Sequence, residues 1–101
     1  MIKLTEDQIK TAIMQTWKNI SNYMLEKFFP RIAKIADQEL LPEGLVLETL
    51  LAFQDVFSDQ HPLMTKDLIY ESIPKFFENL KLGDEGNKAI AFFNKAIKQQ
   101  N

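Results

Sequence analysis

Few side chains in this 101-residue sequence have the type and spacing that catalysis or metal binding requires. His61 is the only histidine, and the stretch DQHP supplies only Asp59 as a neighbouring metal ligand. A zinc site needs about three or four ligands, so a loop histidine beside a proline is the simpler interpretation. The sequence contains no cysteine, which excludes disulfides and thiolate metal sites. We therefore predict a protein without a metal or other cofactor.

Two pairs of carboxylates have a spacing that would place them on one helix face, Asp55 with Asp59 and Glu39 with Glu43. Paired carboxylates act as acid and base only in a cleft that gives them different proton affinities. Both pairs lie in polar segments, where solvated side chains are the more common outcome. The sequence has no G-x-S-x-G, H-E-x-x-H, phosphate-binding loop or EF-hand spacing. We expect no enzyme activity, since an active site would need a cleft that gathers several scattered acids.

The most informative feature is a set of three Phe-Phe doublets, two of which lie in KFFENLKLGDEGNKAIAFFNKAI, residues 75–97. Neighbouring residues on a helix point about 100° apart, so a doublet does not fit one narrow apolar stripe. One interpretation is a small bundle in which each helix packs against two neighbours. The other is an exposed apolar groove between the last two helices, rimmed by lysines, that binds a partner protein or a membrane surface. The partner-binding residues predicted for this groove are Phe76, Phe77, Lys81, Phe92, Phe93 and Lys98.

Length and composition predict a single globular domain over residues 1–101, with 46% hydrophobic and 26% charged residues. The start, MIKLTEDQIK, carries acidic residues where a secretory signal would be basic and then apolar, so we expect a cytoplasmic protein. The net charge of −2 argues against nucleic acid as a partner. The charge is uneven, because residues 1–73 carry 7 basic and 11 acidic side chains and residues 74–101 carry 5 and 3.

Hydrophobic periodicity predicts an all-α fold, an antiparallel four-helix bundle with short connections. Thr5 and Gln8 have the spacing of a capping box at the start of the first helix. An apolar stripe of Ile, Trp and Met residues at helical spacing continues this helix to about Lys27. Pro30 predicts a break or kink, with an extra short helix after it.

The second half of the chain predicts three further helical segments. The first spans about Glu43 to Phe57, with Leu47 and Leu51 widening its apolar face. The next begins near Leu63 and is interrupted by Pro74. In the final turn, Gly83 suits a left-handed conformation and Asp84 is predicted to cap the last helix.

The stretches LPEGLVLETLLAFQDVF and DLIYESIPKFFENLKLGDEGNKAIAFFNKAIKQQN give the chain a family resemblance over about residues 40–101. In element lengths and apolar pattern they resemble the immunity proteins of pediocin-like bacteriocins, which are antiparallel four-helix bundles. This resemblance implies a cytoplasmic protein that protects the producing cell by associating with the sugar-transport permease that the pore-forming peptide attacks. It also implies that the C-terminal half selects the bacteriocin. Pro74 departs from the family's continuous helix, and several members are more basic.

The segment HPLMTKDLIY is similar to the H-P-x-G-S-D-L-I-Y-Y-P segment of the nuclease-colicin immunity proteins, which also have four helices. The chain departs from that pattern by one inserted residue, by the missing Gly, and by Glu71 in place of the second Tyr. Those proteins present a strongly acidic face to a basic nuclease, and a net charge of −2 is small for that role.

A functional alternative of another class is a homodimeric regulatory or structural module. In that case the surplus apolar face is the dimer interface, and an obligate interface buries more than about 2,000 Å². The sequence thus leaves open a monomer that binds a protein partner, with or without contact to a membrane surface, and a homodimer.

Overall fold

The computed structural model of the protein describes residues 1–58 and 66–100. Within this part the chain forms five α-helices, one π-helical turn and a pair of very short strands. The elements in chain order are β1 (Ile2–Lys3), α1 (Glu6–Thr16), α2 (Asn22–Ala36), β2 (Glu39–Leu40), α3 (Pro42–Phe53), the π-helical turn (Gln54–Ser58), α4 (Lys66–Leu80) and α5 (Asp84–Gln100). The predicted all-α, bundle-like fold is confirmed. His61, Asp59 and the predicted helix start near Leu63 lie outside the described residues.

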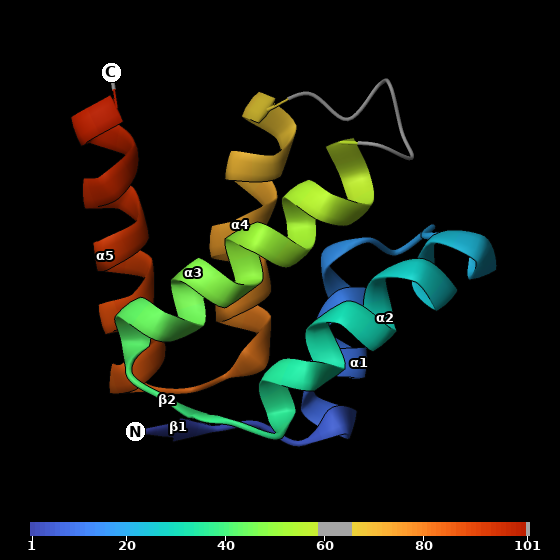
Figure 1. The fold of residues 1–101 in the computed structure, drawn as a ribbon, viewed down its shortest axis with the longest axis horizontal. Coiled ribbons are helices and arrows are strands. Elements are labelled where there is room, and N and C mark those ends of the chain that lie inside the picture. Colours follow the sequence, from blue (N-terminus) through green and yellow to red (C-terminus); the bar gives the residue numbers. More distant parts are fainter. Residues whose placement is uncertain (59–65, 101) are drawn as a thin grey trace.

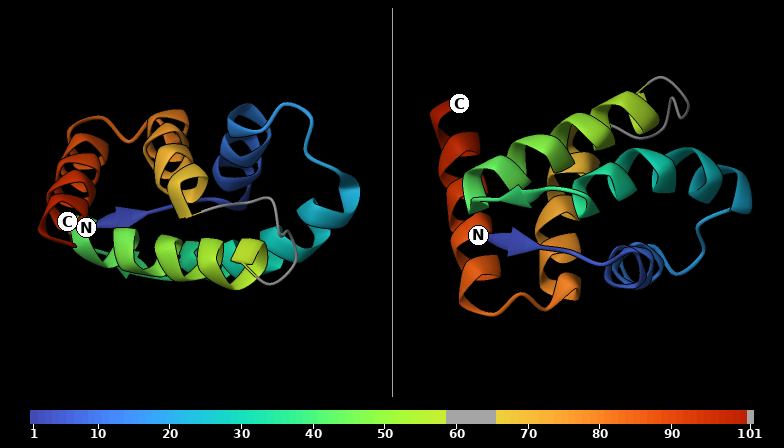
Figure 2. Two further views of the ribbon diagram at one scale, coloured as in Figure 1. Left: turned by 90° about the horizontal axis from the view of Figure 1, so that it is seen from above. Right: turned by 60° about the horizontal axis from the view of Figure 1, so that its bottom comes forward.

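The helices form two layers (Figures 1 and 2). Helices α1, α4 and α5 lie side by side in one layer, with α4 between the other two. Helices α2 and α3 form the second layer, and α3 crosses α4 and α5 obliquely. As a result α4 has neighbours on three sides, whereas the second layer is covered on one side only.

The first helix begins as predicted and ends earlier than predicted. The Thr5 side chain accepts a hydrogen bond from the Gln8 amide at 3.2 Å, and the Gln8 side chain accepts one from the Thr5 amide at 2.9 Å. The helix ends at Thr16, because Trp17 is extended and the Ser21 side chain caps a new helix by accepting from the Met24 amide at 3.2 Å. The prediction of one helix to about Lys27 is therefore wrong, although the apolar stripe continues across the break.

Pro30 lies inside α2 and ends no helix, so the additional fifth helix arises from the break at residues 17–21. A proline in a helix interior costs about 3 kcal/mol. Helix α2 buries Met24 and Phe28 before the proline and Ile32 and Ile35 after it. Because each such side chain contributes about 1.5–3 kcal/mol when buried, packing outweighs the cost of the proline. Pro74 lies inside α4 in the same way.

Two further local features connect segments that are distant in sequence. Strands β1 and β2 pair antiparallel, with Ile2 opposite Leu40, and so attach the N-terminus to the α2–α3 connection. Between α1 and α4, the Asn79 side-chain amide donates to the Thr16 hydroxyl at 3.0 Å. That hydroxyl in turn donates to the Ala12 carbonyl at 2.7 Å.

Two residues in the turn between α4 and α5 have a left-handed backbone conformation. Gly83 has φ +64°, as predicted, and Lys81 has φ +55° directly after α4. The prediction for Asp84 is wrong by one position. The Asn87 amide donates to the Gly83 carbonyl at 3.1 Å, so Gly83 occupies the capping position and Asp84 is the first residue of α5.

Candidate functional site

The structure buries most of the aromatic side chains that were predicted to bind a partner. Phe76, Phe77 and Phe93 are at most 1% exposed, and Phe92 is half-buried. The prediction that Phe76, Phe77 and Phe93 line an exposed groove between α4 and α5 is therefore wrong. The alternative interpretation, that each helix packs against more than one neighbour, accounts for the doublets. Their burial leaves only Phe29 and Phe92 of the six doublet rings partly at the surface.

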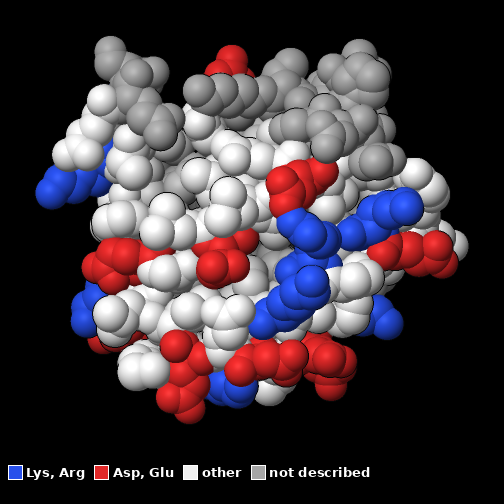
Figure 3. Space-filling view, viewed as in Figure 1, with Lys and Arg blue, Asp and Glu red and all other residues white. Residues whose placement is uncertain are grey.

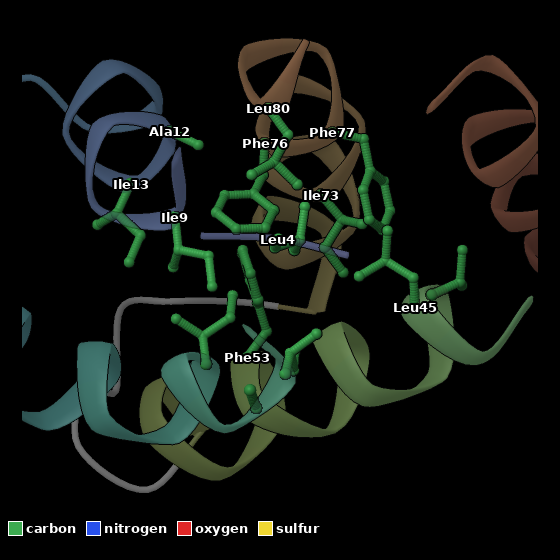
Figure 4. Close-up of a cluster of buried hydrophobic side chains, with 14 of the residues drawn as sticks. Leu4, Ile9, Ala12, Ile13, Leu45, Phe53, Ile73, Phe76, Phe77 and Leu80 are labelled. Carbon is green, nitrogen blue, oxygen red and sulfur yellow. The ribbon is translucent and has the colours of Figure 1, made fainter. Parts of the chain in front are cut away.

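The position of α4 explains why both rings of one doublet are buried. Phe76 lies on the α1 side of α4, near Ile9 and Phe53, and Phe77 points toward Leu45 of α3 (Figure 4). The rings of Phe53 and Phe76 meet edge to face with their centroids 5.8 Å apart. Since α4 contacts α1, α3 and α5, residues that point about 100° apart both meet apolar neighbours.

Further ring contacts link Phe53 of α3 to Phe28 of α2 and to Trp17 in the connection between α1 and α2. The rings of Phe28 and Phe53 are 4.9 Å apart, and Trp17 lies 5.8 Å from Phe28 and 5.2 Å from Phe53. The Phe28–Phe53 and Trp17–Phe28 pairs meet edge to face, whereas the Trp17–Phe53 pair is tilted. Edge-to-face pairs contribute about 0.5–1.5 kcal/mol beyond the area that they bury. Trp17 is thus part of the core, as its place on the first apolar stripe predicts.

The two lysines predicted to bind a partner lie at the surface. Lys81 and Lys98 are both exposed. Lys81 precedes α5 and Lys98 lies in its last turn, so a helix rise of 1.5 Å per residue separates them by roughly 20 Å. They therefore lie at opposite ends of α5.

The large exposed apolar side chains of α3 form a candidate docking surface that the sequence did not predict. Leu47 and Leu51 are 56% and 55% exposed, and Leu50 beside them is half-buried. The prediction that Leu47 and Leu51 widen the buried face is wrong, because the buried residues of α3 lie on the opposite side of the helix. We call Leu47, Leu50 and Leu51 the leucine face. Apolar side chains on the outer side of a helix are normally covered by another element, and the described residues leave Leu47 and Leu51 more than half exposed.

Charged side chains flank the leucine face on both sides. Glu43 and Glu48 are exposed on α3 itself. On α2, exposed basic residues repeat at Lys27, Arg31 and Lys34, which helical spacing places on one face. Arg31 forms an ion pair with Asp55 just beyond α3, so this basic row lies next to the C-terminal end of α3. Figure 3 shows basic side chains gathered beside acidic ones on this side of the molecule.

The inner side of α3 contains an unusual polar group. Thr49 is fully buried, and its hydroxyl has no hydrogen-bond partner among the described residues. A buried hydroxyl without a partner costs about 1–3 kcal/mol of stability. The leucine face and this hydroxyl both lie on α3, the first on its exposed side and the second on its buried side.

The carboxylate pairs considered for catalysis do not form a site. Glu39 is in β2 and Glu43 is in α3, so they do not share a helix face. Asp55 is paired with Arg31, and Asp59 lies outside the described residues. Within residues 1–58 and 66–100, no three His, Asp or Glu side chains are grouped as metal ligands would be. Of the helices described, none combines the length and the apolar character needed to cross a membrane.

Comparisons of the chain with known protein families, with curated proteins and with solved structures give no match.

Proposed function

We propose that this chain is a non-catalytic binding protein whose leucine face docks onto a helix of a partner protein. The observation that carries the proposal is the exposure of Leu47 and Leu51, each more than half exposed on the same side of α3. When a partner covers the exposed part of one of these side chains, the binding free energy gains about 1 kcal/mol. This is about half of the value for burying a whole leucine side chain. Two adjacent leucines with Leu50 thus give a modest, specific apolar contact.

The charges beside the leucine face define the partner's chemistry. Glu43 and Glu48 have no basic partner within ion-pair distance in the described part of the chain. The partner must cover the leucines and must also supply positive charge for these two glutamates. A helix that presents an apolar stripe flanked by Lys or Arg does both, because helices in grooves are recognised by apolar residues about one turn apart. Charged groups at such a rim act mainly on the association rate and the choice of partner.

The most specific form of the proposal is a cytoplasmic bacteriocin immunity protein. It rests on the resemblance to the pediocin-like immunity proteins, and the all-α bundle is consistent with it. The stretch LPEGLVLETLLAFQDVF, which contributes to that resemblance, contains the whole leucine face. In this form the partner is the sugar-transport permease with its bound bacteriocin, and the protein acts by stoichiometric binding without turnover.

The test is expression of the chain in a strain that is sensitive to a panel of pediocin-like bacteriocins. We expect protection against at least one peptide, loss of protection in the double variant Leu47→Ser and Leu51→Ser, and full protection by Met14→Ser. Met14 is a matched control, since it is a 51% exposed apolar residue on α1. Absence of protection against every peptide contradicts the immunity role. Protection that survives the double variant contradicts docking through the leucine face.

The second candidate, a homodimer through the leucine face, is favoured by the arrangement of charges. If two α3 helices pair antiparallel, Glu43 of one copy lies near residue 55 of the other, beside its Lys27 and Arg31. The same contact repeats on the other side of the two-fold axis. We expect such a contact to be weak, because a few leucines bury less than the roughly 800 Å² per partner of a stable interface. Light scattering across a concentration series, with Leu51→Glu as the monomeric control, separates this candidate from a monomer.

A further inference from the structure

We propose that a groove between the start of α1 and the middle of α2 binds a basic, apolar peptide segment of a partner protein. The groove has a volume of about 460 Å³. It is lined by Glu6, Asp7, Lys10, Leu25, Glu26, Phe29 and Pro30. It lies on the edge of α2 away from α3, because Arg31 on the other edge faces Asp55. This site is separate from the leucine face, and neither depends on the other.

The floor of the groove is apolar. Leu25 and Phe29 are one turn apart on α2, and both are half-buried against the core. Phe29 is the member of the first Phe doublet that remains at the surface, while Phe28 is fully buried. Pro30 extends the same apolar surface. A groove of this volume falls within the roughly 300–1,000 Å³ range of binding pockets, and it can hold a few side chains of a peptide.

The rim of the groove is acidic. Three of its side chains are carboxylates, at Glu6, Asp7 and Glu26, and one is the ammonium of Lys10. In the described part of the chain, ion pairs form only between Arg31 and Asp55 and between Lys88 and Glu85. The three carboxylates of the rim therefore have no basic partner there. Acids are expected at a helix start, which accounts for Glu6 and Asp7, whereas Glu26 in the interior of α2 has no such explanation.

The backbone of α2 adds another hydrogen-bond acceptor. A helical residue normally donates its N–H to the carbonyl four residues earlier, and Pro30 has no N–H to donate to the carbonyl of Glu26. Residues 26 and 30 both line the groove. The carbonyl of one groove residue, Glu26, therefore lacks its usual helical donor.

An apolar floor with a mainly acidic rim defines the occupant, since three carboxylates outnumber the single ammonium of Lys10. Lys and Arg side chains supply donors and positive charge, and Leu or Ile side chains between them fill the floor. Anionic lipid surfaces and nucleic acid carry the wrong charge for the rim. A peptide segment of a partner, in which basic and bulky apolar residues alternate, meets both requirements.

The experiment is an NMR titration of the isotope-labelled full chain with a synthetic amphipathic peptide of alternating Lys-Lys and Leu-Leu pairs. The control ligands are the same peptide with every Lys replaced by Glu, and spermine, which has the charge without the apolar groups. We expect the Lys peptide to shift the resonances of Leu25 and Phe29, with affinity that falls as salt is added. We expect the Glu peptide to cause no shift, and spermine to bind at least about tenfold more weakly than the Lys peptide.

Charge variants with unchanged folding, checked by circular dichroism, locate the site. Glu26→Lys should lower the affinity for the Lys peptide about tenfold, since it replaces an attraction at the rim with a repulsion. Glu71→Lys makes the same change in net charge at an exposed position of α4 and should change the affinity less than about twofold. Equal effects of the two variants, shifts confined to the leucine face, or spermine binding as tightly as the peptide would each overturn the proposal.

Discussion

The α4–α5 hairpin and α3 are both rich in large apolar side chains, yet the structure covers them differently. In the hairpin, Phe76, Phe77 and Phe93 are buried, whereas Leu47 and Leu51 of α3 are more than half exposed. Helix α4 lies between α1 and α5 and also meets α3, while α3 belongs to a layer with one open side. Among the described residues, each of these two helices contacts three others, since α3 meets α2, α4 and α5. The placement of the neighbours around a helix, rather than their number or the local density of apolar residues, decides which apolar side chains reach the surface.

The largest effect that sharpens this comparison is expected from the hairpin. Phe76→Ala removes a fully buried ring that contacts Phe53, so it should lower the free energy of unfolding by about 3–5 kcal/mol. Urea unfolding followed by circular dichroism measures this change. A loss below about 1 kcal/mol would mean that the ring is not enclosed as described.

A smaller effect is expected within the doublet at the end of the chain. Phe93 is buried and meets Tyr70 edge to face with centroids 5.9 Å apart, while Phe92 is half-buried. Phe92→Ala should therefore cost about half as much stability as Phe93→Ala, or roughly 1.5–2.5 kcal/mol. The two melting curves, measured side by side, test the order. A larger loss for Phe92→Ala would reverse the assignment of the inner and outer rings.

A gain in stability is expected on the inner side of α3. Thr49→Val keeps the shape of the side chain and removes the hydroxyl that has no partner among the described residues, so it should stabilise the protein by about 1 kcal/mol. Thr49→Ala serves as the control, because it removes the hydroxyl and also leaves a gap. Destabilisation by Thr49→Val would show that the hydroxyl has a partner, such as a buried water molecule.

The smallest effect is expected on the outer side of the same helix. Leu51→Ser should change the free energy of unfolding by less than about 1 kcal/mol, because about half of the side chain is already in water. The same unfolding experiment gives the value. A loss as large as that of Phe76→Ala would show that Leu51 is covered in the isolated chain.

Sequence patterns predicted the fold class and several local features correctly. The capping box of Thr5 and Gln8 and the left-handed Gly83 are set by residues within a few positions, so local chemistry was sufficient. The break at Trp17 was missed because the apolar stripe continues through it. The β1–β2 pair was missed because two-residue strands are too short to show a period.

The candidate sites were less predictable, since exposure depends on contacts between distant segments. The doublets and the leucine face have similar apolar patterns, and only the layer arrangement separates them. Leucines on both the inner and the outer side of α3 were a usable signal, because the outer ones need a cover that the described residues do not supply. The groove joins residues about twenty positions apart in sequence, and helix periodicity does not predict such a junction.

Hydroxyl-radical footprinting with mass spectrometry tests most directly whether the doublets form the core and the leucine face the surface. Phenylalanine and leucine side chains both react with hydroxyl radicals when water reaches them, so the pattern of oxidation reports their exposure. We predict oxidation of Leu47 and Leu51 and protection of Phe76, Phe77 and Phe93 in the folded chain, with all five oxidised after unfolding in urea. Oxidation of the three phenylalanines together with protection of the two leucines in a folded monomer would contradict this account.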